Sequence, residues 1–351
     1  MNCKIAIFKK FGEPLEITTV HIPPLKEGEV LVKILYTTLC RSDITTYTGK
    51  RIEKAPTILG HEIVGRVVSV CSKTPLKDEN GEALHEGDPI TWAIYASNPH
   101  DPMSERGIPQ KAADLFKYGH QLLTPESTLH GGLAEYIILR RHTPIMKLHR
   151  TPLDIAPIIN CAIATTAGAL RLAGDVRGRS VSIFGAGMLG VIACAMCHAH
   201  GASRVLAVDL NEERLKEAVS FGATETMTFA DLQQTEDVFA DVTMDFSGAD
   251  SCMQMGLERL NIGGVTVWVG GVFPQKPLPV NAERVIRNLY TIKGLHNYNA
   301  EDFKNAVNFI EQHCDDYPFE QLIQGHFALN DADKAFKYAL EENPYRVRIK
   351  L

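Results

Sequence analysis

The feature that most constrains the fold is a glycine-rich turn between an apolar strand and an apolar helix. Residues 180–184 predict a short strand without polar alternation, and the loop Gly185–Gly190 follows it directly. An apolar stretch through Ala199 then predicts a helix. A strand that is buried on both faces and followed by a helix is typical of a parallel sheet covered by helices. This part of the chain therefore predicts an α/β fold.

Each glycine of this loop has a separate physical role in binding a dinucleotide. Gly185 permits the tight turn, Gly187 lets the backbone approach a pyrophosphate, and Gly190 lets the helix pack close to the strand. Met188 and Leu189 complete the loop at the start of the helix. The phosphates are expected on exposed amides there, at the positive end of the helix dipole.

Residues at the ends of later strands extend this predicted site. Asp209 ends the strand over residues 205–209, where a carboxylate accepts hydrogen bonds from the adenosine ribose. Because that carboxylate would repel the additional phosphate of NADP, the sequence favours NAD. Arg214 is expected either beside the adenosine or as a solvated helix charge. Ser247 and Val269 end further strands and are expected to contact the cofactor.

The length of 351 residues indicates two domains rather than one core. Residues 1–151 consist of short β-like runs separated by Pro and Gly turns, which predicts a mostly antiparallel β domain. Residues 152–294 carry the alternation of apolar strands and helices. We expect the tail, residues 295–351, to return to the first domain.

Charge and apolar patterning exclude several functions. The formal net charge of -6 leaves no basic face for nucleic acid. No run approaches the roughly 18 apolar residues of a membrane span, and the first residues resemble a strand rather than a signal peptide. The eight Cys lack the spacing of a disulfide framework. We therefore expect a cytoplasmic protein with reduced thiols.

A possible metal site arises from polar residues at the ends of predicted strands. Cys40 follows an apolar strand over residues 31–39, and His61 with Glu62 precedes the next apolar run. Cys161 supplies a second thiol. Thiolates, imidazole and carboxylate are the ligands that zinc prefers. Three protein ligands leave a fourth position open, which distinguishes a catalytic zinc from a structural one.

The order of these motifs resembles that in zinc-dependent medium-chain alcohol dehydrogenases, over essentially the whole chain. The motifs are Cys40-Arg41-Ser42-Asp43, Gly60-His61-Glu62, Gly131-Gly132-Leu133-Ala134-Glu135-Tyr136, Cys161 and Gly185–Gly190. The resemblance implies a GroES-like β domain followed by a Rossmann-type doubly wound domain. It also implies hydride transfer between an alcohol and NAD, and a homodimer or homotetramer whose Rossmann edge strands pair near residues 289–295.

The resemblance further implies individual residue roles. A catalytic zinc is held by three ligands: Cys40, His61 and Cys161. Glu62 stands beside the metal as a supporting group or an occasional ligand. Ser42 passes the alcohol proton toward the cofactor ribose, and Arg41 lies near the pyrophosphate. Thr45 occupies the position where some relatives carry a His that ends this relay, so the last proton step uses Thr45, water or another group.

A second departure concerns the structural zinc that many relatives bind through four Cys. The region from Tyr95 to Tyr118 contains no Cys. The expected ligand positions fall on Asn98, Asp101, Ser104 and Ala112. This set cannot hold zinc tetrahedrally. We expect no structural zinc, and a lobe ordered by packing or by an oligomer contact.

The sequence says little about the substrate. Trp92, Ile94 and Tyr95 predict an apolar pocket wall. Four basic side chains either meet an anionic group or lie on the surface: Lys50, Arg51, Lys117 and His120. Residues 115–120 and 296–298 are similar to a subset of the family associated with phosphonate metabolism, which would imply a substrate carrying a phosphonate.

Two alternatives to a zinc- and NAD-dependent alcohol dehydrogenase have different consequences. A zinc-free reductase of the same superfamily, acting on activated double bonds with NADPH, predicts unrelated residues at the ligand positions and a basic residue near Asp209. A catalytically silent nucleotide-binding protein predicts an eroded ligand set. The intact set Cys40, His61 and Cys161 disfavours both.

Overall fold

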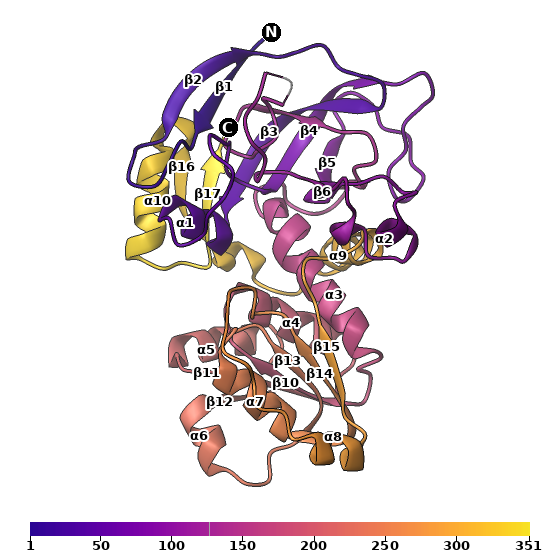
Figure 1. The fold of residues 1–351 in the computed structure, drawn as a ribbon, viewed down its shortest axis with the longest axis vertical. Coiled ribbons are helices and arrows are strands. Elements are labelled where there is room, and N and C mark those ends of the chain that lie inside the picture. The colour runs from indigo at the N-terminus through magenta and orange to yellow at the C-terminus, as the bar shows by residue number, and fades with distance from the viewer. Residues whose placement is uncertain (126) are drawn as a thin grey trace. The chain divides into compact units, whose positions relative to one another are not determined.

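The computed structural model describes residues 1–125 and 127–351, which form two compact units (Figure 1). The first unit comprises Met1–Cys161, Asn299–Cys314 and Phe319–Leu351. The second comprises Ala162–Tyr298 and Asp315–Pro318. The first unit thus extends past residue 151 to Cys161, and most of the tail from Asn299 belongs to it.

A seven-stranded sheet is the framework of the first unit, in the order β16-β17-β3-β4-β5-β9, with β8 also pairing with β3. Its strands are β3 (Glu29–Leu39), β4 (Glu62–Cys71), β5 (Pro89–Trp92), β8 (Tyr136–Leu139), β9 (Ile145–Lys147), β16 (Ile323–Ala328) and β17 (Arg346–Lys350). All pairs are antiparallel except β16 with β17. Because β17 pairs with β3, with Val347 opposite Leu39, the tail completes the sheet beside the end of β3.

Two short hairpins and several helices complete this unit. The hairpins are β1 (Asn2–Ile7) with β2 (Glu16–His21), and β6 (Tyr95–Ala96) with β7 (Phe116–Lys117). The α-helices are α1 (Arg41–Tyr47), α2 (Pro102–Glu105), α9 (Ala300–His313) and α10 (Ala332–Glu341). The remaining short turns are η1 (Pro109–Lys111), η2 (Ala156–Ile158), η3 (Ile159–Ile163), η4 (Phe319–Leu322) and η5 (Leu329–Asp331).

Helix α10 fixes the position of α1, which follows the metal-ligand candidate Cys40. Its buried residues recur at helical spacing: Ala332, Ala335, Phe336 and Ala339. Tyr47 of α1 stacks on Phe336 with ring centroids 4.2 Å apart, and its hydroxyl donates to Asp333 Oδ1 at 2.8 Å. An aromatic stack and a hydrogen bond from a half-buried Tyr together hold the end of α1 against the tail.

The second unit contains a six-stranded, fully parallel sheet in the order β12-β11-β10-β13-β14-β15. This is the order 3-2-1-4-5-6 of a doubly wound dinucleotide-binding fold, as the sequence predicts. Its strands are β10 (Ser180–Phe184), β11 (Arg204–Asp209), β12 (Glu225–Thr228), β13 (Ala240–Asp245), β14 (Leu260–Trp268) and β15 (Thr291–Gly294). Its helices are α3 (Ala164–Ala173), α4 (Met188–Ala199), α5 (Glu212–Ser220), α6 (Phe229–Gln234), α7 (Asp250–Glu258) and α8 (Ala282–Asn288).

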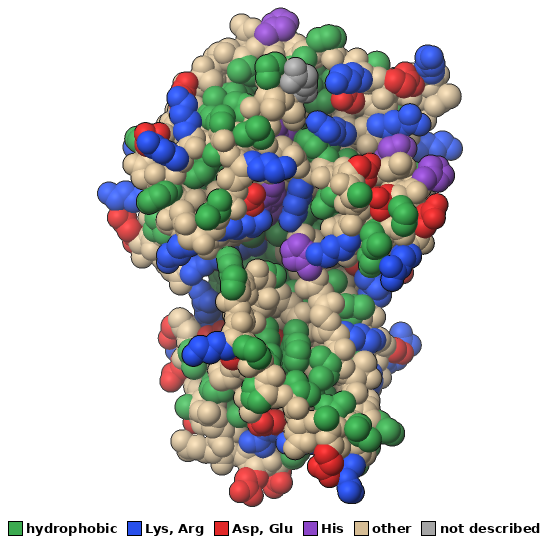
Figure 2. All heavy atoms as spheres, viewed as in Figure 1, with side chains coloured by type: hydrophobic (Ala, Val, Ile, Leu, Met, Phe, Trp, Pro, Cys, Tyr) green, Lys and Arg blue, Asp and Glu red, His purple; other side chains and the backbone are tan. Residues whose placement is uncertain are grey.

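One stretch corrects the expectation that no run approaches the length of a membrane span. Ala156–Ala173 is helical over 18 residues and apolar enough to qualify by length and composition. However, 78% of it is buried inside the protein, where α3 packs against α4 and β14. A core helix explains this stretch. Figure 2 shows Lys, Arg, Asp and Glu side chains intermingled on one face of the first unit, without a single field of one sign.

Candidate metal centre and dinucleotide loop

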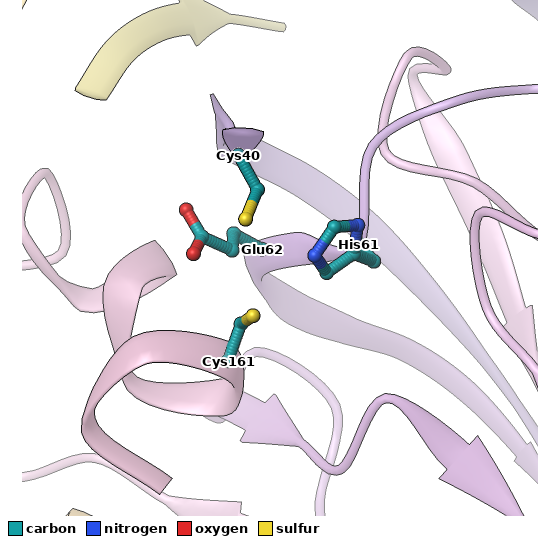
Figure 3. Close-up of side chains that lie close together, drawn as sticks. All are labelled: Cys40, His61, Glu62 and Cys161. Atoms are coloured by element: carbon teal, nitrogen blue, oxygen red, sulfur yellow. The ribbon is translucent and has the colours of Figure 1, made fainter. Parts of the chain in front are cut away.

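Four side chains of the first unit converge on one point: Cys40, His61, Glu62 and Cys161 (Figure 3). One ligand atom from each lies within 4.8 Å of the others. Sheet pairing explains part of this convergence, because Thr38 at the end of β3 lies opposite Glu62 at the start of β4. The residue after β3 and the residue before β4 are therefore neighbours, although about twenty residues separate them.

Cys161 reaches this point from a helical turn of unusual geometry. It lies in η3, a π-helical turn between η2 and α3. A π-helical turn inserts one extra residue per turn and changes the direction of the side chains that follow, which is common at functional sites. Periodicity along the sequence did not predict this turn.

Asp43 connects the two chain segments that carry Cys40 and His61. Its Oδ2 accepts from the backbone of Cys40 at 2.9 Å, and its Oδ1 accepts from the backbone of Gly60 at 3.1 Å. His61 Nδ1 lies 3.3 Å from Asp43 Oδ1, an ion-pair contact rather than an aligned hydrogen bond. Burial lowers the pKa of His61, but the Asp43 and Cys40 charges outweigh it and raise that pKa to about 10. With Nδ1 facing Asp43, Nε2 is the ring nitrogen available to a metal.

Arg346 of β17 is the functional-site residue that sequence reasoning missed. It donates to both carboxylate oxygens of Glu62, from Nε at 2.6 Å and from Nη2 at 2.7 Å. Its Nη2 also lies 3.5 Å from Cys40 Sγ. Thr38 donates a further bond to Glu62 Oε2 at 2.6 Å. Nothing in the local pattern of the tail distinguishes Arg346 from the other basic residues of its strand.

The charges of this buried cluster fit a divalent cation. The Cys161 thiol hydrogen-bonds to Cys40, which lowers the pKa of Cys40 well below its usual value, and Arg346 adds to this effect. The same bond, together with burial, raises the pKa of Cys161 well above its usual value. With both thiols ionised, the two thiolates and the carboxylates of Glu62 and Asp43 carry four negative charges, of which Arg346 balances one. Since buried charge must be compensated, a bound M²⁺ with soft ligands would balance two of the remaining three.

Three further candidates lie on α1, directly after Cys40. Ser42 and Thr45 are half-buried, and the Thr45 hydroxyl donates to the Ser42 carbonyl at 2.9 Å. Arg41 is exposed and donates from Nη1 to Asn343 Oδ1 at 2.9 Å. The Thr45 hydroxyl is therefore engaged with its own helix.

The glycine loop of the second unit has the geometry that its sequence predicts. Gly185 has φ +93°, a conformation that side chains disfavour. A Cβ on Gly190 would lie 1.8 Å from the Gly185 carbonyl oxygen, so only glycine permits this close packing of helix on strand. At Gly187, which precedes α4, a Cβ would meet only Arg214 Nη1, at 3.8 Å. Arg214 therefore lies beside the loop.

The other predicted cofactor residues are arranged around this loop. Asp209 Oδ2 accepts from the Ala186 backbone at 2.6 Å, and its Oδ1 accepts from Asn211 at 2.9 Å. A Cβ on Gly185 would lie 2.8 Å from the Ser247 nitrogen. Three more candidates are a buried Met188, a half-buried Leu189 and a buried Val269 after β14. The carboxyl ends of adjacent parallel strands thus bring these positions together.

Comparison with known proteins decides the family. The model of the alcohol dehydrogenase GroES-like domain matches residues 26–150, and that of the zinc-binding dehydrogenase domain matches residues 189–312. The chain belongs to the zinc-dependent medium-chain alcohol dehydrogenase family. This dehydrogenase is an oxidoreductase of the alcohol dehydrogenase type.

Relatives resemble the dehydrogenase along its whole length. An alcohol dehydrogenase of Malus domestica is 27% identical, with 100% of this chain and 97% of the relative covered. The crystal structure of an alcohol dehydrogenase from Thermotoga maritima has a TM-score of 0.93 and 26% identity, covering 100% of this chain and 99% of the other. A zinc-binding dehydrogenase from Sinorhizobium meliloti bound to NADP has a TM-score of 0.86 with 100% of both chains covered, and at 19% identity shows the fold alone.

Carboxylates organise the lobe from Tyr95 to Tyr118, which lacks Cys. Asp101 accepts from the backbone of Met103 at 2.8 Å, which caps α2, and from Ala113 at 3.0 Å. Asp114 accepts from the Asn98 backbone at 3.1 Å. The two carboxylates therefore connect the start and end of the lobe of the dehydrogenase through main-chain amides.

Proposed function

We propose that the protein is a zinc- and NAD-dependent alcohol dehydrogenase that interconverts an alcohol with an aldehyde or ketone. The observation that carries this proposal is the convergence of Cys40, His61 and Cys161 within one compact unit. These residues would hold the metal, with Glu62 engaged by Arg346 rather than ligating it. Zinc bound there would supply a Lewis acid that favours the alkoxide form of the alcohol, and NAD would supply the hydride acceptor.

The protein's own residues then orient and move a proton. Asp43 fixes the His61 ring, and the Glu62–Arg346 pair supports Cys40. Ser42, at the start of α1, is the proposed acceptor of the alcohol proton on its way to the cofactor ribose. Because the Thr45 hydroxyl donates to the Ser42 carbonyl, we assign the last proton step to water.

Metal analysis of freshly purified protein tests this proposal. We expect about one zinc per chain and zinc-dependent oxidation of alcohols with NAD. Protein without zinc that reduces activated double bonds with NADPH would support the zinc-free reductase. Protein that binds a dinucleotide and turns over neither class of substrate would support the silent nucleotide-binding protein.

We propose NAD rather than NADP as the cofactor because of Asp209. This half-buried carboxylate follows β11 and would meet the ribose hydroxyls with negative charge. Arg214 beside Gly187 is the only feature of the loop that favours an additional phosphate. The test is the ratio of kcat/KM for NAD and NADP in the wild type and in Asp209→Ser. We expect NAD to be preferred at least tenfold, and the preference to fall in the variant but not in Asp231→Ser.

We further propose that the substrate carries an anionic group such as a phosphonate. The His120 ring lies 5.1 Å from that of His61, and its Nδ1 is 3.1 Å from Glu53 Oε1. Arg51 pairs with the same carboxylate. Lys117 lies near Arg51, and burial together with the Arg51 charge lowers the pKa of this lysine. Lys117 is therefore a second basic side chain close to the Glu53 carboxylate.

Steady-state rates test the anionic substrate. A hydroxyalkylphosphonate is compared with an uncharged alcohol of the same length. We expect at least a tenfold preference for the charged series, reduced by Lys117→Gln but not by the exposed Lys54→Gln. Equal rates for both series in the wild type would refute an anionic substrate and leave the dehydrogenase assignment intact.

We propose a homodimer formed through the second unit. In the described chain β15 pairs only with β14, so its other edge is available for a strand from a second copy. Ile286 and Leu289, just before β15, are 72% and 71% exposed. Hydrophobic side chains also gather on the face of this unit that Figure 2 shows. Sedimentation should give a dimer that Leu289→Asp dissociates, and a monomeric wild type would contradict this.

We also propose a cytoplasmic location. All eight Cys are unbridged thiols, which suits a reducing compartment. Fractionation of cells expressing the protein at its natural level tests this, and recovery in an extracytoplasmic fraction would contradict it.

A further inference from the structure

A second cavity in the first unit lies between the lobe and the seven-stranded sheet. Its volume is about 550 Å³, within the range of small-molecule sites. Its walls come from three parts of the chain: the segment before β3, the β6–β7 hairpin with its flanks, and the loops on either side of β8. We call this cavity the lobe pocket. None of the candidate metal ligands lines it.

Two adjacent arginines follow β8 at the rim of the lobe pocket. The Arg140 guanidinium stacks over the Phe116 ring, with its central carbon 3.7 Å from the ring centroid. Stacking occupies the face of the guanidinium and leaves its in-plane N–H donors at the edge. The stem of Arg141 lies against Gly28, where an added Cβ would come within 2.8 Å of it. No ion pair joins either guanidinium to a carboxylate in residues 1–125 and 127–351.

Three acidic residues described in the lining of the lobe pocket accept hydrogen bonds from backbone amides. Glu27 accepts from the Lys73 backbone at 3.0 Å, and Glu29 accepts from the Lys26 backbone at 2.7 Å. Asp114 accepts from the backbone of Asn98. Each carboxylate thus stabilises a turn of the wall. The guanidinium groups of Arg140 and Arg141, in contrast, stabilise no turn among the residues that the structure describes.

The rest of the lining mixes polar side chains, such as Lys26, Asn98 and Thr128, with apolar ones and one buried imidazole. Apolar side chains include Pro23, Pro24, Leu129 and Ile138. His130 is 1% exposed, and neither of its ring nitrogens meets a hydrogen-bond partner among the described residues. Its ring stands edge-on to Phe116 with centroids 6.4 Å apart. A buried polar group without a partner calls for a functional or solvent explanation, and here it lies beside the cation-bearing wall.

We propose that the lobe pocket binds a small organic anion, with a phosphate or carboxylate group on Arg140 and Arg141 and an apolar body against Phe116 and the prolines. Planar guanidinium donors match the two oxygens of such a group. The site is independent of the proposed dehydrogenase chemistry. Because its walls come from both the lobe and the sheet, a bound anion would connect these two parts of the first unit.

The test uses the full-length, zinc-loaded protein saturated with dinucleotide, so that the phosphate-binding loop is already filled. Calorimetric titration with phenyl phosphate, benzoate and inorganic phosphate measures binding to the wild type and three variants. Arg140→Gln and Arg141→Gln remove the proposed contacts. Arg66→Gln is the matched control, since Arg66 is an exposed cation of the same unit that donates to the Gly87 carbonyl.

We expect saturable binding of one aromatic anion per chain, weakened at least tenfold by Arg140→Gln and less than twofold by Arg66→Gln. The tighter of phenyl phosphate and benzoate identifies the oxyanion. Hydrogen exchange over residues 96–116 should slow on binding in the wild type and in Arg66→Gln. Absence of saturable binding by any of the three probes, or equal affinity in the wild type and both pocket variants, would overturn the proposal.

Discussion

Two regions of the first unit bring separate chain segments together in different ways. At the metal centre, two thiols and an imidazole from three separate segments face one another in a buried site. In the lobe, Asp101 and Asp114 hold separate chain segments together by accepting hydrogen bonds from backbone amides. Carboxylate-to-amide bonds are sufficient where the only task is to hold the chain. A centre that must polarise a substrate needs donors that bind a cation and leave a position open.

The largest effect on activity is expected when one thiol is removed from the metal centre. Cys161→Ala should lower kcat/KM on the order of 10³-fold, because the Lewis acid contributes several kcal/mol to the barrier. Dinucleotide affinity should stay within about twofold, because its loop belongs to the second unit. The matched control is Cys71→Ser, a half-buried thiol outside the cluster, which should retain activity. Retained turnover in Cys161→Ala would refute the metal site.

The next effect concerns the buried ion pair that supports the metal centre. Arg346→Met leaves the Glu62 carboxylate buried without its bidentate partner, and should lower the free energy of unfolding by about 3–5 kcal/mol. The double variant Arg346→Met with Glu62→Gln should recover most of this loss, since both charges are then absent. Denaturant titration measures both. A double variant as unstable as the single one would show that the arginine acts through packing instead.

A smaller effect is expected in the lobe. Asp101→Ala removes the cap of α2 and the bond to Ala113, and should lower the free energy of unfolding by about 1–2 kcal/mol. Hydrogen exchange should rise over residues 98–113, while zinc content stays unchanged. Glu105→Ala, an exposed change in the same helix, is the control. Loss of zinc in Asp101→Ala would contradict this comparison, because it would show that the lobe also supports the metal centre.

The smallest effect is expected at a third place where a carboxylate holds chain segments together by accepting backbone hydrogen bonds. Glu311 of α9 accepts from the backbones of His149, Arg150 and Thr151. Burial raises the pKa of Glu311, but these hydrogen bonds and that of the Thr151 hydroxyl outweigh it and hold that pKa below 4.5. The stabilisation is therefore present above pH 4.5 and is lost as the pH falls through the lowered pKa.

Glu311→Gln should accordingly cost about 1 kcal/mol at pH 7, because Glu311 is only half-buried and solvent screens part of the interaction. The difference from the wild type should shrink as the pH falls below 4.5. Unfolding curves at pH 7 and at acid pH measure it. A difference that grows toward acid would contradict the assigned role of the carboxylate.

Short-range patterns predict a large part of this molecule. The strand before the glycine loop begins and ends at the predicted residues, Ser180–Phe184, and the helix after the loop ends at Ala199 as predicted. The strand predicted to end at Val269 ends at Trp268, and it begins as early as Leu260, which pairs with Ala240 of β13. That extension depends on a neighbouring strand and leaves no mark in local hydrophobicity.

The sequence by itself determines the chemistry of the metal-ligand candidates, because residue type specifies the softness of a ligand. It also determines the close-packed glycine loop, because short spacing specifies the backbone conformation there. The partners that make those donors useful come from far away. Arg346 reaches Glu62 across 284 positions, and Glu311 reaches Thr151 across 160. Such pairings depend on which strands and helices pack together, a choice made by the burial of whole surfaces. The sequence therefore identifies Cys40, His61 and Cys161 as candidate ligands. Only the tertiary structure shows that the Arg346 guanidinium lies beside Cys40.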